Sequence, residues 1–212
     1  MSLRIVEPWK SAAASVPGVT PARPHLQPVS GEDATVVTLL LQRVVDGERE
    51  AVGEFFDRFE GEVNRLVWSM LGADADHDDL VNQAFESMLG KISSLRVPAA
   101  LHGWVRQVTV NTVRMELRRR RWRRFFGSND EQALEHPDLR VPDEAERARL
   151  RDLYTALGKL GPDDRTMVVL RHLEGLELTE LAATFEVSLA TLKRRLARAE
   201  QRLAKFLQGG EV

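Results

Sequence analysis

Residues 179–207 read TELAATFEVSLATLKRRLARAEQRLAKFL, which predicts two helices joined by a very short turn. The second helix begins at Ser188, whose hydroxyl can accept a hydrogen bond from a free N–H group of the first helical turn. At about 100° per residue, one face of this helix is apolar and the opposite face is basic. The apolar face holds Leu189, Leu192, Leu196, Ala199, Leu203 and Leu207, and the opposite face holds Thr191, Arg194, Arg198, Arg202 and Lys205.

A short helix, a tight turn and a basic second helix form the helix-turn-helix pattern of DNA-binding proteins. The alternative is an amphipathic helix whose basic face is only solvated. The preceding helix at residues 179–185 favours nucleic acid. Glu186 argues against it, because such turns often place glycine there, and a positive φ costs other residues about 1 kcal/mol.

The chain has 212 residues, enough for one or two domains with real cores. It contains no cysteine, which excludes disulfide bonds and thiolate metal sites. No apolar run approaches the length of a membrane span, and the first thirty residues lack a signal-peptide core. We therefore expect a cytoplasmic protein with no membrane insertion.

The net charge of −2 hides separate charged blocks. Residues 37–100 hold 6 basic and 12 acidic residues, and residues 101–124 hold 8 and 1. Residues 125–146 hold 1 basic and 7 acidic residues, and residues 178–212 hold 6 and 4. Such segregation indicates different partners for different faces of the molecule.

Apolar residues at helical spacing predict four helices, at about residues 34–46, 49–71, 76–92 and 101–124, and no alternating pattern predicts a strand. The third helix is expected to turn Leu89 inward with its other apolar residues. The inward residues expected for the fourth helix are Trp104, Val105, Val108, Thr112, Met115 and Leu117. Short loops between apolar stripes predict an all-α fold, with these helices in one bundle.

Composition divides the chain further. Residues 1–34 carry five of the nine prolines and are predicted to be a disordered tail. Residues 125–142 are acidic and contain Gly127, Pro137 and Pro142, so we expect a flexible linker there. Helices at about 143–160 and 162–174 then precede the helix-turn-helix. The predicted domains are therefore residues 35–124 and residues 143–208.

The fourth predicted helix ends in a cluster of seven arginines between Arg114 and Arg124. Such a run typically neutralises phosphates and gives salt-dependent affinity. Trp104 and Trp122, near the two ends of this helix, could stack on unpaired bases. The alternatives are core packing for Trp104 and a ring covering apolar surface for Trp122.

Four aspartates, Asp74, Asp76, Asp78 and Asp79, cluster at the start of the third helix. They do not fit a calcium loop, because Asp79 takes the glycine position and Phe85 takes the position of the bidentate glutamate. We expect a helix cap or an exposed acidic docking face instead. The sequence also lacks G-x-S-x-G, P-loop and G-x-G-x-x-G motifs, so it predicts no enzyme, catalytic residue, metal or cofactor.

Several segments resemble regions 2 and 4 of sigma-70 factors. DLVNQAF at 79–85 is similar to the DLVQ-E-x-F signature of region 2. WVRQVTVN at 104–111, followed by Leu117 and Arg118, resembles W-L-x-x-I-A-x-N…L-R of its final helix. LGKLGP at 157–162, Arg165 and LR at 170–171 resemble L-x-x-L-P…R…L-R of region 4. VSLATLK at 187–193, with LA at 181–182 and Arg195, resembles its helix-turn-helix.

Because only regions 2 and 4 are present, over residues 35–124 and 143–207, the chain is similar to the extracytoplasmic-function (ECF) group of bacterial sigma factors. The resemblance implies a non-enzymatic subunit that gives RNA polymerase its promoter specificity. Its partners would be the polymerase core, promoter DNA and, where one exists, an anti-sigma factor. The implied core-docking residues are Asp79, Asn82, Gln83 and Glu86. Those implied for the minus-10 element are Trp104, Asn111, Arg114, Arg118, Arg119, Arg120 and Arg121. Those implied for the minus-35 element are Ser188, Ala190, Thr191, Lys193, Arg194, Arg195 and Arg198.

Two alternatives remain open at this point. A free-standing helix-turn-helix regulator would bind palindromic half-sites as a dimer. A regulatory adaptor would dock on polymerase, or bind an inhibitory partner helix, without initiating transcription.

Overall fold

The structure is a computed structural model that describes residues 31–72, 74–125 and 144–208. Over these residues it contains eight α-helices, two short 3-10 turns and no strand, which confirms the all-α fold. Residues 1–30 of the predicted tail and residues 126–142 of the predicted linker lie outside the described residues. The remaining tail residues, 31–34, are helical, so the prediction of disorder is wrong for them. The helices are α2 (Gly31–Val45), α3 (Arg49–Leu71), α4 (His77–Leu89), α5 (Leu101–Phe125), α6 (Glu144–Gly158), α7 (Pro162–His172), α8 (Leu178–Thr184) and α9 (Leu189–Leu207).

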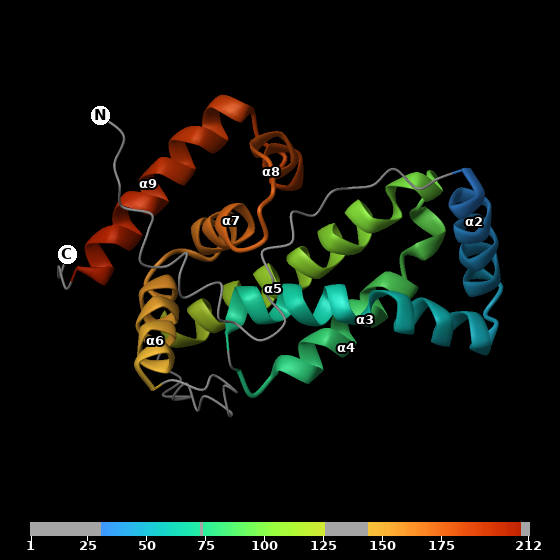
Figure 1. The fold of residues 1–212 in the computed structure, drawn as a ribbon, viewed down its shortest axis with the longest axis horizontal. Coiled ribbons are helices and arrows are strands. Elements are labelled where there is room, and N and C mark those ends of the chain that lie inside the picture. The colour runs from blue at the N-terminus through green and yellow to red at the C-terminus, as the bar shows by residue number, and fades with distance from the viewer. Residues whose placement is uncertain (1–30, 73, 126–143, 209–212) are drawn as a thin grey trace.

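Helices α2–α5, which we call the N-terminal helices, pack around the apolar stripe of α3 (Figure 1). Phe55, Phe59 and Val63 of that stripe are fully buried, as their spacing predicts. The turns η1 (Ile92–Ser94) and η2 (Pro98–Ala100) connect α4 to α5. Helices α6–α9, the C-terminal helices, lie toward the other end of α5 in Figure 1.

The two groups of helices pack against each other, because α7 lies against both α5 and α3. We call this contact the seam. Gly72 ends α3 at φ 74°, and a Cβ there would lie 2.9 Å from the ring of Tyr154 in α6. The Tyr154 hydroxyl donates to the carbonyl of Trp68 at 3.2 Å, so glycine permits both the turn and the close approach.

Some apolar residues lie on the surface although their spacing predicted burial. Leu189, Leu207, Met115 and Leu89 are 38%, 43%, 54% and 37% exposed. Leu189 and Leu207 are the first and last residues of α9, and Leu89 is the last residue of α4. Met115 borders a surface cavity together with Gln83 and Glu86 of α4, and Val110 and Val113 of α5 are buried instead. Helix α4 also stops at Leu89, three residues before the predicted end.

Candidate nucleic-acid interface

Helices α8 and α9 form the predicted helix-turn-helix, and local hydrogen bonds define where each helix begins. Glu177 and Glu180 form a capping box at the start of α8, in which each carboxylate accepts the backbone N–H of the other residue. Glu186 lies in the turn with φ 53°, the left-handed conformation that usually favours glycine. Ser188 Oγ accepts the N–H of Thr191 at 3.2 Å, which confirms the predicted start of α9.

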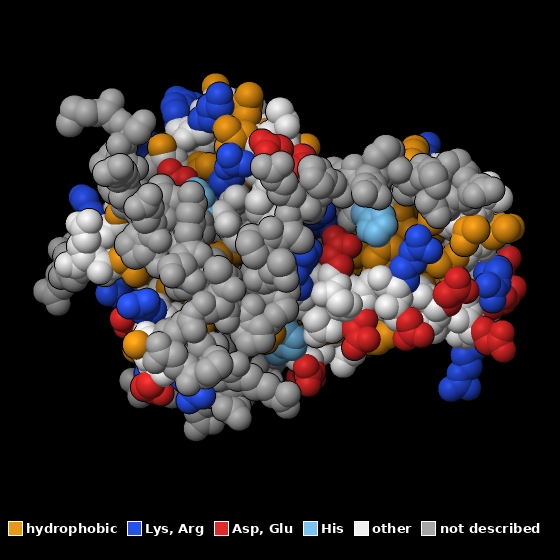
Figure 2. All heavy atoms as spheres, in the orientation of Figure 1, with side chains coloured by type: hydrophobic (Ala, Val, Ile, Leu, Met, Phe, Trp, Pro, Cys, Tyr) orange, Lys and Arg blue, Asp and Glu red, His pale blue; other side chains and the backbone are white. Residues whose placement is uncertain are grey.

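Helix α9 is buried on one side and presents basic residues on the other. Leu192, Leu196, Ala199 and Leu203 are buried against the other C-terminal helices. Lys193, Arg194 and Arg198 are exposed, and within the described part of the chain none of them forms an ion pair. Figure 2 shows basic side chains gathered at the end of α9 nearest α8, and acidic side chains at the other end of the molecule.

The remaining residues predicted for the minus-35 element differ in their exposure. Ser188 and Ala190 are exposed beside the turn, and Thr191 is half-buried, with its Oγ1 accepting from Arg194 at 3.4 Å. Arg195 is turned toward α7, where its guanidinium lies 3.3 Å from a carboxylate oxygen of Asp164. The structure therefore brings six of these seven residues to the outer side of the helix-turn-helix.

The first half of α5 contributes Trp104 and Asn111 to the predicted minus-10 set. Trp104 is half-buried and packs against the apolar core, as one of the two sequence interpretations proposed. Asn111 is exposed, and its Oδ1 accepts hydrogen bonds from Gln107 at 3.4 Å and Arg114 at 3.2 Å. The Gln107 side chain also donates to the carbonyl of Thr184 in α8 at 3.1 Å. This face of α5 thus touches the helix-turn-helix.

Asp163, in the first turn of α7, binds two arginines of the predicted minus-10 set. Arg114 and Arg118 donate to its carboxylate at 3.0 Å and 2.9 Å. Burial alone would raise the pKa of Asp163, but Arg114 and then Arg118 outweigh it, so the pKa is lowered. The Arg114 guanidinium also lies 4.6 Å from the centre of the Phe185 ring. The carboxylate therefore stays ionised and neutralises this part of α5.

Asp163 and its neighbour Asp164 also bind arginines of α9. Arg195 lies 3.8 Å from Asp163, and Arg202 lies 3.8 Å from Asp164. One acidic pair therefore contacts basic residues from both predicted DNA-binding helices. Sequence reasoning missed this role, because acidic residues after Pro162 resemble ordinary complements to the helix dipole.

The Arg120 side chain is mostly buried and is directed toward the aspartates before α4. It donates to Asp74 at 2.9 Å, to Asp76 at 2.8 Å and to Glu116 at 3.1 Å. Burial alone would raise the pKa of Asp74, but its hydrogen bonds with Arg120 lower it, and the pKa of Arg120 is raised in turn. Asp76 makes no side-chain cap of α4, so the predicted cap is wrong for this residue and an ion-pair cluster replaces it.

The other two arginines of the predicted minus-10 set are exposed. Arg119 makes only a long ion pair with Glu116, at 3.9 Å, and Arg121 faces the start of α7. Arg118, Arg119, Arg120 and Arg121 therefore point in four directions, as expected for consecutive residues of a helix.

The residues predicted to dock on polymerase share the outer face of α4. Asp79, Asn82, Gln83 and Glu86 are all exposed. Gln83 and Glu86 also line a cavity of about 270 Å³ between α4 and α5. The acidic docking face expected from the sequence is thus accessible in this structure.

The described residues offer neither a metal site nor a membrane span. No group of three His, Asp or Glu side chains there could hold a metal ion. No helix in those parts of the chain is long and apolar enough to cross a membrane.

Comparison with known proteins matches most of the chain to one family. The model of the family described as "ECF sigma factor" matches residues 34–209. ECF RNA polymerase sigma factor SigE of Mycolicibacterium smegmatis is 32% identical over 166 residues, which are 74% of this chain and 60% of SigE. The alignment therefore spans less than two thirds of that relative.

Solved structures show the same fold. CnrH, solved in complex with the cytosolic domain of CnrY, aligns with a TM-score of 0.54 and 21% identity, over 82% of this chain and 97% of CnrH. The sigma factor RpoE of Bartonella quintana, solved with the anti-sigma factor NepR, aligns with a TM-score of 0.54 and 22% identity, over 73% and 97%. With the family match, these comparisons establish that the chain belongs to the ECF sigma factors, a family of non-enzymatic proteins that direct promoter recognition and transcription initiation by RNA polymerase.

Proposed function

We propose that this sigma factor reads the minus-35 element of its promoters with the exposed face of α9. The observation that carries this proposal is that Lys193, Arg194 and Arg198 have no ion pair with any described residue, on a helix whose other side is buried. Cations of this kind can neutralise DNA phosphates, and arginine can also donate to the O6 and N7 atoms of guanine. Ser188, Ala190 and Thr191 lie at the leading end of the helix, where base edges would be contacted.

Helix α5 is assigned to the minus-10 element through Trp104, Asn111 and its exposed arginines. Arg120 is better suited to anchoring the segment before α4, because three carboxylates already surround it. Arg114 and Arg118 are different, because a single carboxylate, Asp163, binds both. DNA phosphates could replace that carboxylate if α7 moved away.

Promoter binding by both helices therefore requires the seam to open. The groups that would separate are the domains predicted from the sequence, residues 35–124 and 143–208. Arg65 and Glu174 also form an ion pair across the seam, at 3.3 Å. Opening would replace these internal ion pairs with contacts to polymerase and promoter DNA, so its net cost depends on both partners.

The polymerase core is assigned to the outer face of α4, where Asp79, Asn82, Gln83 and Glu86 are exposed. An anti-sigma factor is a further partner, because the similar RpoE was solved with one. Such a partner would regulate the chain by occupying a surface that polymerase or DNA needs.

Run-off transcription tests the function directly. Core polymerase would be supplied with a template from upstream of the protein's own gene, with and without the full chain. We expect start-site-specific RNA only when the chain is present. Core binding without RNA would favour the docking-only adaptor, and DNA binding without core binding would favour the free-standing regulator.

A pair of variants tests the docking face, by measuring binding to core polymerase and to an isolated minus-35 duplex. Asp79→Ala should weaken core binding and leave binding to an isolated minus-35 duplex unchanged. Asp78→Ala is the matched control, because Asp78 is also an exposed acidic residue in the first turn of α4. Circular dichroism should show equal helicity in both variants, since either change removes a favourable charge from the helix start. Undiminished core binding by Asp79→Ala would remove that residue from the docking face.

A further inference from the structure

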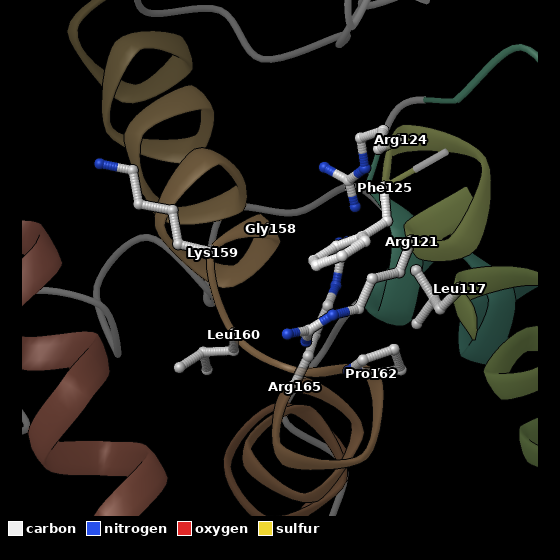
Figure 3. A pocket seen from close by; sticks show the side chains of 9 residues that line it. All are labelled: Leu117, Arg121, Arg124, Phe125, Gly158, Lys159, Leu160, Pro162 and Arg165. Carbon is white, nitrogen blue, oxygen red and sulfur yellow. The ribbon is translucent and has the colours of Figure 1, made fainter. Parts of the chain in front are cut away.

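A cavity of about 270 Å³ lies at the seam, between the last turns of α5 and the connection from α6 to α7 (Figure 3). Three arginines line it: Arg121 and Arg124 from α5, and Arg165 from α7. Among the described residues, no acidic side chain lines it. Lys159 contributes only its aliphatic stem, because its ammonium group is directed toward the Phe206 ring at 5.4 Å and away from the arginines in Figure 3.

Arg121 and Arg124 differ from the other arginines of α5 in their ion pairing. Within the described part of the chain, neither of them has a carboxylate within ion-pair distance, whereas each of the others does. The paired residues are Arg106, Arg114, Arg118, Arg119, Arg120 and Arg123. The two unpaired arginines of α5 thus meet at one cavity.

Two further features make the cavity electropositive. Arg165 donates from Nε to the carbonyl of Met70 at 2.9 Å, which fixes its guanidinium without neutralising it. Burial, and to a lesser degree Arg120, lowers the pKa of Arg165 to about 10, so the group stays charged at neutral pH. Gly161, the N-cap residue of α7, provides no side-chain cap, and a Cβ there would lie 3.1 Å from an Nη atom of Arg121. The positive end of the α7 dipole therefore faces the same space.

The charge of Arg124 contributes to lowering the pKa of Arg165, so these like charges repel each other, and an anion bound between them would relieve the repulsion. Guanidinium groups bind phosphate with paired N–H donors, and three of them suit an anion with several adjacent phosphoryl groups. Leu117, Leu160, Pro162 and the ring of Phe125 also line the cavity, on different sides of the arginines in Figure 3, and this apolar lining could contact a nucleobase or ribose.

We propose that this cavity binds a small anion with adjacent phosphoryl groups, either inorganic polyphosphate or a nucleoside triphosphate. Its lining comes from both groups of helices, so the ligand would bind only while the seam is closed. It would therefore stabilise the arrangement in which Asp163 covers Arg114 and Arg118, and would reduce the fraction of chains able to bind a promoter. Binding of the anion itself does not depend on the proposed promoter contacts.

Isothermal titration calorimetry on the full chain at low salt tests the proposal, with inorganic tripolyphosphate, ATP and GTP as separate ligands. We expect one ligand per chain. Arg121→Ala and Arg124→Ala should each weaken binding about tenfold, the loss of one charge-assisted contact. Arg123→Ala is the matched control, because Arg123 is an exposed arginine of the same turn that pairs with Glu116 outside the cavity, and its change should be under about threefold. Thermal melts should show that all three variants fold.

The ligands separate the two sources of the same chemistry. Tighter binding of ATP or GTP than of tripolyphosphate would mean that the apolar lining contacts the nucleoside. Equal binding would mean that the site recognises the phosphoryl groups alone. Three results would overturn the proposal: no binding, several ligands per chain, or equal weakening by Arg123→Ala. A fourth is that Arg124→Ala weakens a promoter duplex but not tripolyphosphate, because the cavity arginines would then serve DNA.

Discussion

The two basic helices of this sigma factor, α9 and α5, have similar charge but differ in whether their basic side chains form ion pairs. On α9, Lys193, Arg194 and Arg198 are exposed and have no ion pair among the described residues. On α5, Arg114, Arg118 and Arg120 each bind a carboxylate from another helix or loop. The difference shows that a run of arginines does not by itself reveal how much charge is available to DNA. Under the proposed function, α9 could bind DNA as it is, whereas Arg114 and Arg118 of α5 would first have to lose an internal partner.

The largest expected effect is on the free energy of unfolding, and it distinguishes Arg120 from Arg119. Arg120→Ala would leave Asp74 and Asp76 without their cation, and breaking a largely buried ion pair typically costs about 3 kcal/mol of unfolding free energy. Arg119→Ala should cost under about 0.5 kcal/mol, because its pair with Glu116 is long and exposed. Urea denaturation measures both. Equal stability of the two variants would contradict the structural role of Arg120 and return it to the DNA-binding set.

The next effect tests α9 alone. Arg198→Ala should weaken binding to a minus-35 duplex by about tenfold and reduce the salt slope by about one, since one phosphate or base contact is lost. Lys205→Ala is the control, because Lys205 is exposed near the other end of the same helix. Fluorescence anisotropy at several salt concentrations gives both quantities. An unchanged slope for Arg198→Ala would remove that residue from the DNA face.

A smaller effect tests the carboxylate that α5 and α9 share. Asp163→Asn would release Arg114 and Arg118 and remove a negative charge from the seam, so the affinity for a single-stranded minus-10 oligonucleotide should rise by about threefold. Asp152→Asn makes the same charge change at an exposed position of α6 and should have little effect. Equal affinities in the two variants would mean that Asp163 does not compete with DNA.

The smallest effect is a dependence of stability on pH. Asp163 has a lowered pKa in the folded chain, so the unfolded chain binds a proton more readily at that position. Its stabilising contribution is complete well above the unfolded pKa of about 3.9 and is lost as the pH falls through the folded value. Unfolding free energies measured between about pH 5 and pH 3 should fall less steeply in Asp163→Asn, by at most about 1 kcal/mol. A steeper fall in the variant would contradict the sign of the shift.

Local sequence signals predicted the helices and the exposed basic face of α9. The spacing of Phe55, Phe59 and Val63 predicted the core face of α3, and Ser188 marked the start of α9. These features depend on residues within one or two turns of each other. The exposure of Arg194 and Arg198 followed from the same periodicity.

The pairing across the seam could not be predicted in this way. Asp163 lies 49 and 45 residues from Arg114 and Arg118, so the contact depends on how α7 packs against α5. Leu189 and Met115 were placed in the core for a similar reason, because periodicity identifies an apolar face but not where its packing partner ends. The charge blocks indicated separate partners for separate faces. They did not indicate that acidic residues of the chain itself, such as Asp163, would bind the arginines of α5.

We propose that the seam opens when the sigma factor binds polymerase and promoter DNA, and a distance measurement tests this opening most directly. The chain has no cysteine, so single cysteines at Glu60 of α3 and Gln201 of α9, both exposed, would carry a fluorescent donor and acceptor. Energy transfer would be measured in the free chain and after addition of core polymerase and promoter DNA. We expect high transfer in the free chain and a large decrease in the complex. Unchanged transfer in a complex that makes RNA would contradict the account.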